Sequence, residues 1–458
     1  MKKYSRSLAL LLALIMIFSV AACSGSDIPE ETTEDIAETA STTAPETTET
    51  TTEVTTEEPS VSVVAPPETT VEITSPPETE PPRATDTVSI IMQSGRGEAI
   101  LSGLAEEKNK PLLEAREKSL LYDLGLEIEL SKTDDLKSKI ENLVLSGENK
   151  YDLILTDPTI GTEMLSGGLL EDVSGAGISI TTAPGINESI TASLSFGEKT
   201  YLFSSCALVS DVTSAYALKY NGAKLSSDPA EKALSGEFTT ELLLTYVKEA
   251  SFSLGDADPL TLYRGIGGEI FIKNESGIPM SALADSSRFF KTYGETLALL
   301  VEDSQESAAF TVEKISPLQN GEIYLPIPKT SVDLEYSSPV DHETLSLFAA
   351  PAGIVSGTRL NHLVTALNSH SVAYTEGVRA EITLKGARES AELLKVICSS
   401  ARLDLGILLG WGDIHELISE GLDKSTSAEA IISDRMTEMR NKAVDTAAKI
   451  VADRLGIK

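Results

Sequence analysis

The sequence has few of the residues on which several protein classes depend. Its 458 residues include 3 cysteines, 4 histidines and 1 tryptophan, and aromatic residues make up 5% of the chain. Three cysteines cannot form a disulfide scaffold, and four histidines leave little material for a zinc site. Lysine and arginine total 37 against 70 acidic residues, which gives a formal net charge of -33. Nucleic-acid binding needs an excess of cations, so this balance excludes a nucleic-acid partner.

The motifs of common enzymes are also missing. The sequence contains neither a G-x-S-x-G nucleophile elbow nor a G-x-x-x-x-G-K-[ST] phosphate loop. Residues 415–419 begin like a zinc-protease helix, but Ser419 stands where the second histidine ligand is needed. We therefore expect no catalytic residue, no metal and no cofactor, and an enzyme is the weakest interpretation of the chain.

The N-terminus has the regions of an export signal. Three basic residues precede an apolar run over residues 8–20, which is too short to span a bilayer. Small residues then lead directly into Cys23, an arrangement that resembles the lipobox of bacterial lipoproteins. The resemblance implies removal of residues 1–22 and lipidation of Cys23, where two or three acyl chains would anchor the protein stably. The alternative is an ordinary secretory signal with a chance cysteine.

A low-complexity segment follows this cysteine. Residues 24–86 carry 16 acidic residues and a single arginine, are rich in threonine and proline, and include no aromatic residue. Such a segment cannot bury enough apolar surface to offset its conformational entropy. We predict that residues 23–86 form a disordered stalk, extended by charge repulsion and by paired prolines.

Beyond the stalk, the hydrophobic pattern alternates between strands and helices. Strands are indicated at 88–92, 126–130 and 151–155, with helices between them at 98–121 and 133–146. This order predicts a parallel sheet with right-handed crossovers. Ligands bind such sheets at the carboxyl ends of the strands. The candidate ligand residues that follow the first and third strands are Ser94, Arg96, Thr156 and Asp157. For Arg96, a plain surface position is an equal alternative.

Later segments continue this pattern. Further expected elements are helices at 238–250, 359–373, 387–400 and 428–455, a strand at 344–350, and an extended segment at 323–328. The extended segment follows from its two prolines, which exclude a helix. Cys206 and Cys398 are either buried thiols or one bridge of an exported protein, and we favour unpaired thiols.

Several segments resemble, in a shared order, the extracellular solute-binding proteins (family 1-like) of bacterial ABC importers, in particular those of Gram-positive lipoprotein type. Residues 151–154 with 168–173 are similar to the family pattern YDLI…GLLxDL, and 324–329 to LPxPK. Residues 238–242 are similar to WTxxEL, with Phe238 in place of tryptophan. The late matches are 389–397, 402–406 and 411–414.

The resemblance implies an α/β fold of the periplasmic-binding-protein-like type II. Two lobes would be joined by a hinge, each with a central, mostly parallel sheet. Lobe one would comprise residues 87–203 plus 335–375, and lobe two residues 207–322 plus 376–458. Ligand would bind in the cleft between the lobes, and the hinge would close around it.

The resemblance adds two candidate ligand residues. Trp411, the single tryptophan, lies in a matching motif and is a candidate stacking platform for a sugar ring. Tyr201 lies near the first expected crossing between the lobes. For each of them, packing in the core or at the hinge is the alternative.

The resulting hypothesis is a monomeric protein, lipid-anchored through Cys23 at the extracellular face of the cell membrane. It would capture a small solute, foremost a carbohydrate, and deliver it to an ABC permease. A different class competes with this one, because carbohydrate clefts are usually more aromatic than this sequence allows. In that class the chain is a surface scaffold or sensor that keeps the solute-binding fold without transport.

Overall fold

The computed structural model describes residues 84–432, with gaps at 97–99, 149, 176–184, 198, 223–224, 303–307, 354–355 and 412–413. The expected signal peptide, Cys23, nearly all of the stalk and most of the expected helix at 428–455 lie outside the described residues. Contacts divide the chain into two units, and the elements below all belong to the second, Glu78–Lys458. Within the described part, no helix combines the length and the apolar character needed to cross a membrane.

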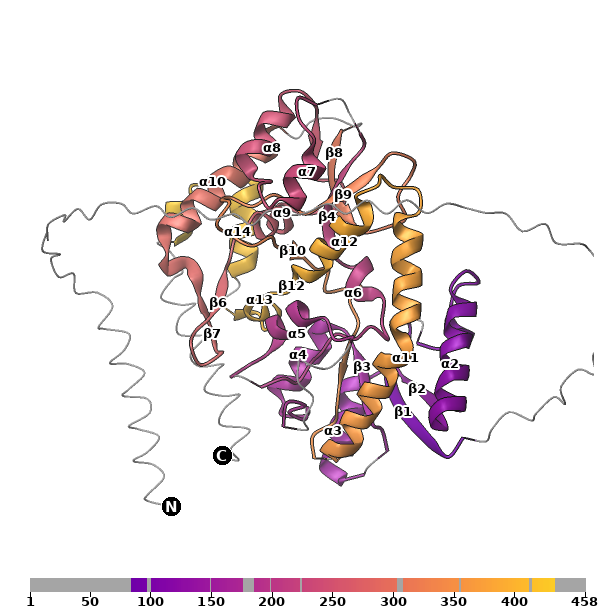
Figure 1. Cartoon of the computed structure of the whole chain (residues 1–458). Coiled ribbons are helices and arrows are strands. Elements are labelled where there is room, and N and C mark those ends of the chain that lie inside the picture. Colours follow the sequence, from indigo (N-terminus) through magenta and orange to yellow (C-terminus); the bar gives the residue numbers. More distant parts are fainter. Residues whose placement is uncertain are drawn as a thin grey trace, which may run out of the picture. The chain divides into compact units, whose positions relative to one another are not determined.

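Four strands form the first sheet, in the order β11-β3-β1-β2, and β1, β2 and β3 are labelled in Figure 1. The strands are β1 (Asp86–Gln93), β2 (Leu126–Thr133), β3 (Leu153–Thr156) and β11 (Leu347–Ala349). β1 runs parallel to both neighbours, with Ile90 opposite Leu130 and Ile91 opposite Ile154, whereas β11 is antiparallel to β3. The connecting helices are α2 (Lys110–Leu124) and α3 (Leu136–Ser146), and α4 (Pro158–Ser166) follows β3. The predicted β-α-β-α-β order is confirmed.

The helix expected at 98–121 is wrong in its first half. A short 3-10 turn, η1 (Ser102–Leu104), occupies part of that segment. The helix α2 begins only at Lys110, with Pro111 in its first turn. Proline lacks an N–H and clashes with a preceding helical turn, so it starts a helix and is not found within one. Gly125 ends α2 with φ 66°, and a Cβ at this position would lie 2.4 Å from Thr85 Oγ1.

Polar side chains fix the starts of the other predicted helices. The carboxylate of Asp135 accepts a hydrogen bond from the Ser138 N–H and caps α3. Thr239 caps α8 (Thr240–Val247) in the same manner, by accepting from the Leu242 N–H. The helix expected at 238–250 is thus confirmed in a shorter form.

The second sheet has the order β5-β8-β4-β9. Its strands are β4 (Tyr216–Tyr220), β5 (Phe252–Ser253), β8 (Phe310–Lys314) and β9 (Ile323–Leu325). The helices that belong to this part are α7 (Pro229–Leu234), α8, α9 (Pro259–Gly265) and α10 (Ser286–Glu302). β5, β8 and β9 share one direction and β4 runs opposite to them. The first sheet is therefore mostly parallel, as expected, whereas the second is mixed, because β4 pairs antiparallel with both of its neighbours.

The remaining elements are short. Two further pairs of strands are β6 (Phe271–Lys273) with β7 (Pro279–Ser281), and β10 (Ser338–Pro339) with β12 (Ala401–Arg402). The other elements are η2 (Ala282–Ala284), α5 (Glu188–Leu194), α6 (Ser210–Thr213), α12 (Ser390–Ser399), α13 (Leu405–Leu408) and α14 (Ile414–Asp423).

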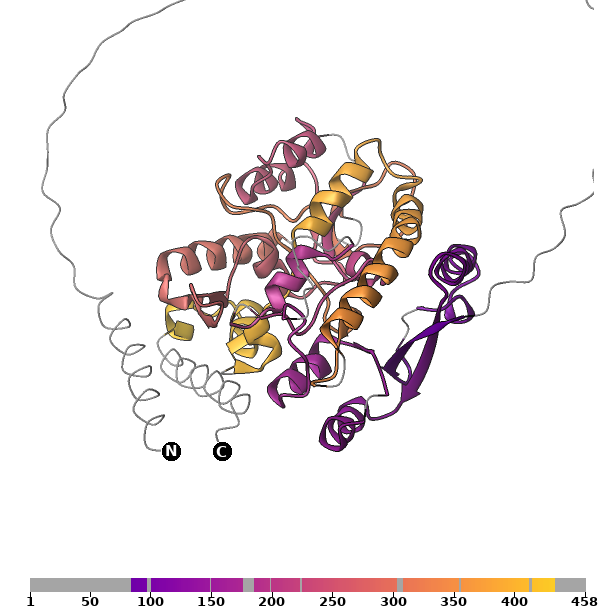
Figure 2. The same ribbon diagram turned by 60° about the horizontal axis from the view of Figure 1, so that its bottom comes forward.

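One long helix links the two parts of the fold. α11 (Gly357–Thr383) is the long orange helix of Figures 1 and 2. Leu360 and Leu367 in its first half belong to the apolar cluster of the first sheet. Near its end, the Ile382 carbonyl accepts from the Leu318 N–H, in the chain just after β8. α11 is continuous through residues 375 and 376, where the expected lobe boundary falls.

Apolar packing is continuous between the two sheets. The largest cluster of buried apolar residues includes Ile91 and Ile154 from the first sheet and Ala217 and Tyr324 from the second. Smaller clusters belong to each sheet separately. The two sheets therefore share one apolar cluster.

Candidate functional site

A cavity of about 580 Å³ lies at the carboxyl ends of β1 and β3. Ser94 and Arg96, which follow β1, and Asp157, which follows β3, all line it. The remaining lining residues come from the ends and loops of other elements: Gln93, Gly95, Leu104, Glu106, Asn109, Val209, Ser210, Thr213, Glu343, Thr344, Ser346 and Tyr374. Three of the residues chosen from the sequence are thus brought together in one polar cavity.

Arg96 connects the ends of three strands at this cavity. Its Nη1 lies 3.4 Å from Asp157 Oδ2, and its Nη2 donates to Ser346 Oγ at 3.0 Å. Nη2 also donates to the carbonyl of Leu345, just before β11. The side chains of Arg96 and Asp157 are 12% and 16% exposed, so the pair is largely shielded from water. The guanidinium is therefore held in place, which favours recognition of a polar group.

Asp157 has a second contact that fixes its position. Its Oδ1 accepts a hydrogen bond of 2.8 Å from the Ile160 N–H and caps α4. The neighbouring Thr156 is fully buried as the last residue of β3, and its hydroxyl donates to the Asp157 carbonyl at 3.1 Å. Thr156 therefore contacts the backbone of the loop after β3 and does not line the cavity.

Ser94 is exposed at the mouth of the cavity. Its backbone N–H donates to the Thr133 carbonyl at 2.7 Å, which ties the loop after β1 to the end of β2. Its side chain is therefore presented from a fixed backbone position.

Tyr201 and Trp411 lie elsewhere in the fold. They are 1% and 2% exposed, and both belong to the apolar cluster shared by the two sheets. The Trp411 ring meets Phe271 edge to face, with centroids 5.7 Å apart. The buried Nε1 of Trp411 has no hydrogen-bond partner among the described residues. Neither residue lines the strand-end cavity, and the packing alternative describes their positions.

The sequence did not point to the other walls of the cavity. Ser346 and its neighbours are placed there because β11 runs antiparallel to β3, which brings the start of β11 to the end of β3. The sequence predicts a strand at 344–350 but does not say whether it pairs parallel or antiparallel. Without that direction, the end of the strand that lies at the cavity could not be predicted. Ser210 and Tyr374 come from α6 and α11, whose positions depend on long-range packing.

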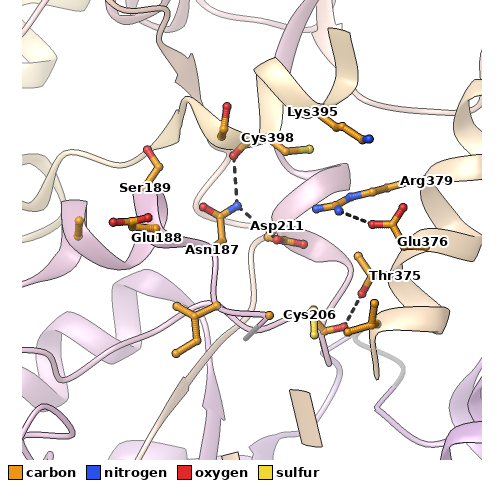
Figure 3. Close-up of a pocket in the computed structure, with 15 residues that line it drawn as sticks. Asn187, Glu188, Ser189, Cys206, Asp211, Thr375, Glu376, Arg379, Lys395 and Cys398 are labelled. Carbon is orange, nitrogen blue, oxygen red and sulfur yellow. Dashed lines mark hydrogen bonds and ion pairs between the residues drawn. The ribbon is translucent and has the colours of Figure 1, made fainter. Parts of the chain in front are cut away.

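A second cavity, of about 610 Å³, lies among α5, α6, α11 and α12 (Figure 3). Asn187 donates to the Cys398 carbonyl at 3.2 Å and to Asp211 Oδ2 at 3.3 Å. Arg379, which points into the cavity in Figure 3, donates to Glu376 at 2.8 Å. The walls of this cavity thus come from the second half of α11, from α12 and from the residues around the start of α5.

Two cysteines line this second cavity. Cys206 and Cys398 are buried and unpaired, which confirms the favoured interpretation. Burial raises the pKa of each thiol to about 12, so both are neutral thiols at physiological pH. Within the described residues, no group of three or more histidine, cysteine, aspartate or glutamate side chains is placed to hold a metal ion.

Comparisons with known proteins give structural likenesses only. Neither a family model nor a curated protein matches the sequence. The galacto-N-biose-/lacto-N-biose I-binding protein of an ABC transporter from Bifidobacterium longum matches at 13% identity and a TM-score of 0.48, over 80% of this chain and 98% of that chain. An extracellular solute-binding protein family 1 member from Alicyclobacillus acidocaldarius matches at 11% identity and 0.46, over 83% and 100%.

A third solved structure is the GacH receptor of Streptomyces glaucescens, described in unliganded form and in complex with acarbose. It matches at 13% identity and a TM-score of 0.41, over 81% of this chain and 99% of that chain.

Proposed function

We propose that this chain is a lipid-anchored extracellular substrate-binding protein that captures a small solute, a carbohydrate, and delivers it to an ABC permease. The observation that carries the proposal is the polar cavity at the ends of β1 and β3, with the Arg96–Asp157 pair at its wall. Anchoring through Cys23 and the permease partner rest on the sequence motifs alone. The proposed role is binding, without any bond made or broken.

The lining of the cavity supports a polyhydroxylated solute. The hydroxyl of Ser94 and the amide of Asn109 can both donate and accept hydrogen bonds, as sugar hydroxyls require. The Ser210 hydroxyl accepts from the Ser346 N–H and can still donate. Charged groups at Arg96 and Asp157 add stronger, directional partners.

The proposed motion is closure of two lobes, residues 87–203 plus 335–375 and residues 207–322 plus 376–458. α11 packs on the first sheet with its first half and contacts elements of the second part near its end. The boundary at 375 and 376 lies within α11, so the two lobes share one continuous helix. Closure would therefore require the contacts of this helix with one of the lobes to slide.

A thermal-shift screen tests the proposal. The full chain carrying Cys23→Ser is screened against monosaccharides, oligosaccharides, amino acids and peptides. A ligand present at about 100 times its Kd adds about 2.7 kcal/mol of stability. We expect stabilisation by one class of carbohydrate, and a screen without any stabilising solute would overturn the proposal. Mass spectrometry of the membrane-bound protein tests the anchor, which predicts acyl chains on Cys23.

One observation favours a second candidate, a surface scaffold or sensor without transport. The largest apolar cluster runs from the first sheet to the second and includes Trp411 and Phe271. Such packing would resist the opening and closing that transport binding requires. A chain that binds no solute yet retains a specific protein partner at the cell surface would support this candidate.

A further inference from the structure

A third cavity, which shares Ala192 with the second cavity and no residue with the strand-end cavity, is lined by several cations. It measures about 210 Å³ and is lined by residues of α5, α9, β6, β12 and α13 and of the loops around them. Its cations are Arg264, Lys273 and Arg402, and its carboxylates are Glu269 and Asp404. In a chain with a formal net charge of -33, three cations around one small cavity are unexpected.

Arg264, in the last turn of α9, has the fewest partners of the three cations. Its guanidinium offers five N–H donors, and its single hydrogen bond within the described residues joins Nη2 to the Arg402 carbonyl at 3.4 Å. That acceptor is neutral and the bond is long. Burial lowers the pKa of Arg264, because removal from water disfavours the charged form.

Lys273, at the end of β6, is also bound by neutral groups. Its Nζ donates to Ser195 Oγ at 2.8 Å and to the carbonyl of Ala192 in α5. An ammonium has three N–H donors, so one donor has no acceptor among these contacts. Burial lowers the pKa of Lys273 to about 8, and the charge of Asp404 opposes this shift only in part.

Arg402 and the two carboxylates do not remove this excess. Arg402 Nη1 lies 3.6 Å from Glu269 Oε1, while the other oxygen of Glu269 lies 3.0 Å from Arg288 Nη1. Asp404 caps α13, with Oδ1 accepting from two backbone N–H groups and Oδ2 accepting from the Phe271 N–H. Glu269 is thus shared between Arg402 and Arg288, and the charge of Asp404 acts on both Arg264 and Lys273. The cavity still has three cations against two carboxylates.

We propose that this cavity binds a small oxyanion, either a carboxylate or a tetrahedral sulfate or phosphate group, with Arg264 as its main donor. Arginine recognises oxyanions through paired N–H···O bonds, and Lys273 and Arg402 stand on the same cavity to add charge. A bound oxyanion would neutralise the excess charge among side chains that are only partly exposed, where such pairing is stronger than in bulk water. The cavity shares no lining residue with the strand-end site, so this inference does not rest on the proposed transport function.

Calorimetric titration with sodium sulfate and, separately, sodium acetate tests the site. The full chain with Cys23→Ser is titrated at constant ionic strength, balanced with sodium chloride, so that general salt effects cancel. We expect one or both anions to bind, and the preference between them separates a tetrahedral from a carboxylate ligand. Arg264→Gln is expected to weaken binding by about tenfold or more, the loss of one charge-assisted hydrogen bond.

The matched control is Arg388→Gln, because Arg388 is exposed before α12 and lines none of the cavities described here. It removes the same charge and should leave anion affinity unchanged. Lys273→Met is a second variant that decides the question if Arg264→Gln does not fold by circular dichroism. Its expected effect is also weaker binding. The proposal is overturned if the unmodified site binds neither anion, or if the folded cavity variants bind as tightly as Arg388→Gln.

Discussion

Arg96 and Asp157 face each other across the ends of β1 and β3, with 3.4 Å between Nη1 and Oδ2. Asp157 caps α4 through its other oxygen, and Arg96 also donates to Ser346 before β11. The pair therefore fixes the loops of three strands around one cavity. A change at either residue is expected to alter both local stability and the shape of the cavity.

The cap and the ion pair at Asp157 can be separated by substitution. Asp157→Asn keeps an oxygen that can cap α4 but loses the charge that faces Arg96, whereas Asp157→Ala loses both. We expect Asp157→Ala to lower the free energy of unfolding by about 1 kcal/mol more than Asp157→Asn, in urea titrations. Asp135 caps α3 and forms no ion pair with an arginine among the described residues, so it gives the matched pair of control variants. Equal losses for the two Asp157 variants would contradict the capping role.

Trp411 is the single tryptophan, so intrinsic emission reports on this residue alone. Because its ring is 2% exposed and packs on Phe271, we expect blue-shifted emission that iodide does not quench. A solute bound in the strand-end cavity should leave this resistance to quenching unchanged. Ready quenching that a sugar relieves would show instead that Trp411 is a stacking platform.

The two buried thiols are expected to resist alkylation. Their pKa values are raised to about 12, and the thiolate is the reactive form. In the chain with Cys23→Ser, iodoacetamide at pH 8 should modify neither Cys206 nor Cys398 while the protein is folded. Both should react fully in urea at the same pH, as counted by mass spectrometry. Rapid modification of the native protein would show that the second cavity is open to solvent and that the thiols are activated.

Lys273 gives a pH dependence of defined sign. Its pKa is lowered to about 8 in the folded chain from an ordinary value of 10.5. Between these values the unfolded chain binds more protons at this residue, so folding stability gains as pH rises through that window. Below pH 8 the lysine is charged in both states and the gain is absent.

The measurement is the free energy of unfolding in urea across pH, for the protein and for Lys273→Met, without added oxyanion. The difference between the two should rise in favour of the lysine form from about pH 8 to about pH 10.5. A flat or falling difference would contradict the lowered pKa.

The sequence predicts the first half of the fold well because its signals are local. The strands β1, β2 and β3 follow from short apolar runs, and Asp135 marks the start of α3. The strand-end rule then selects Ser94, Arg96 and Asp157 for the cavity.

The same rule selects Thr156, which is buried, because a position near the end of a strand does not say which way a side chain faces. Ser346 and Tyr374 reach the cavity through pairing and packing over long sequence separations. No local pattern encodes these contacts. Trp411 was selected from its place in a motif, but it is buried in the apolar core. A motif position alone does not say whether a side chain faces a cleft or the core.

The most direct test of solute capture is calorimetric titration of the best carbohydrate from the screen into the chain with Cys23→Ser, with and without Arg96→Gln. We expect saturable binding to one site, weakened by about tenfold or more in Arg96→Gln through loss of a charge-assisted hydrogen bond. The control Arg388→Gln should bind as the parent does. Binding that is unchanged in a folded Arg96→Gln, or absent from the parent, would contradict a solute site at the ends of β1 and β3.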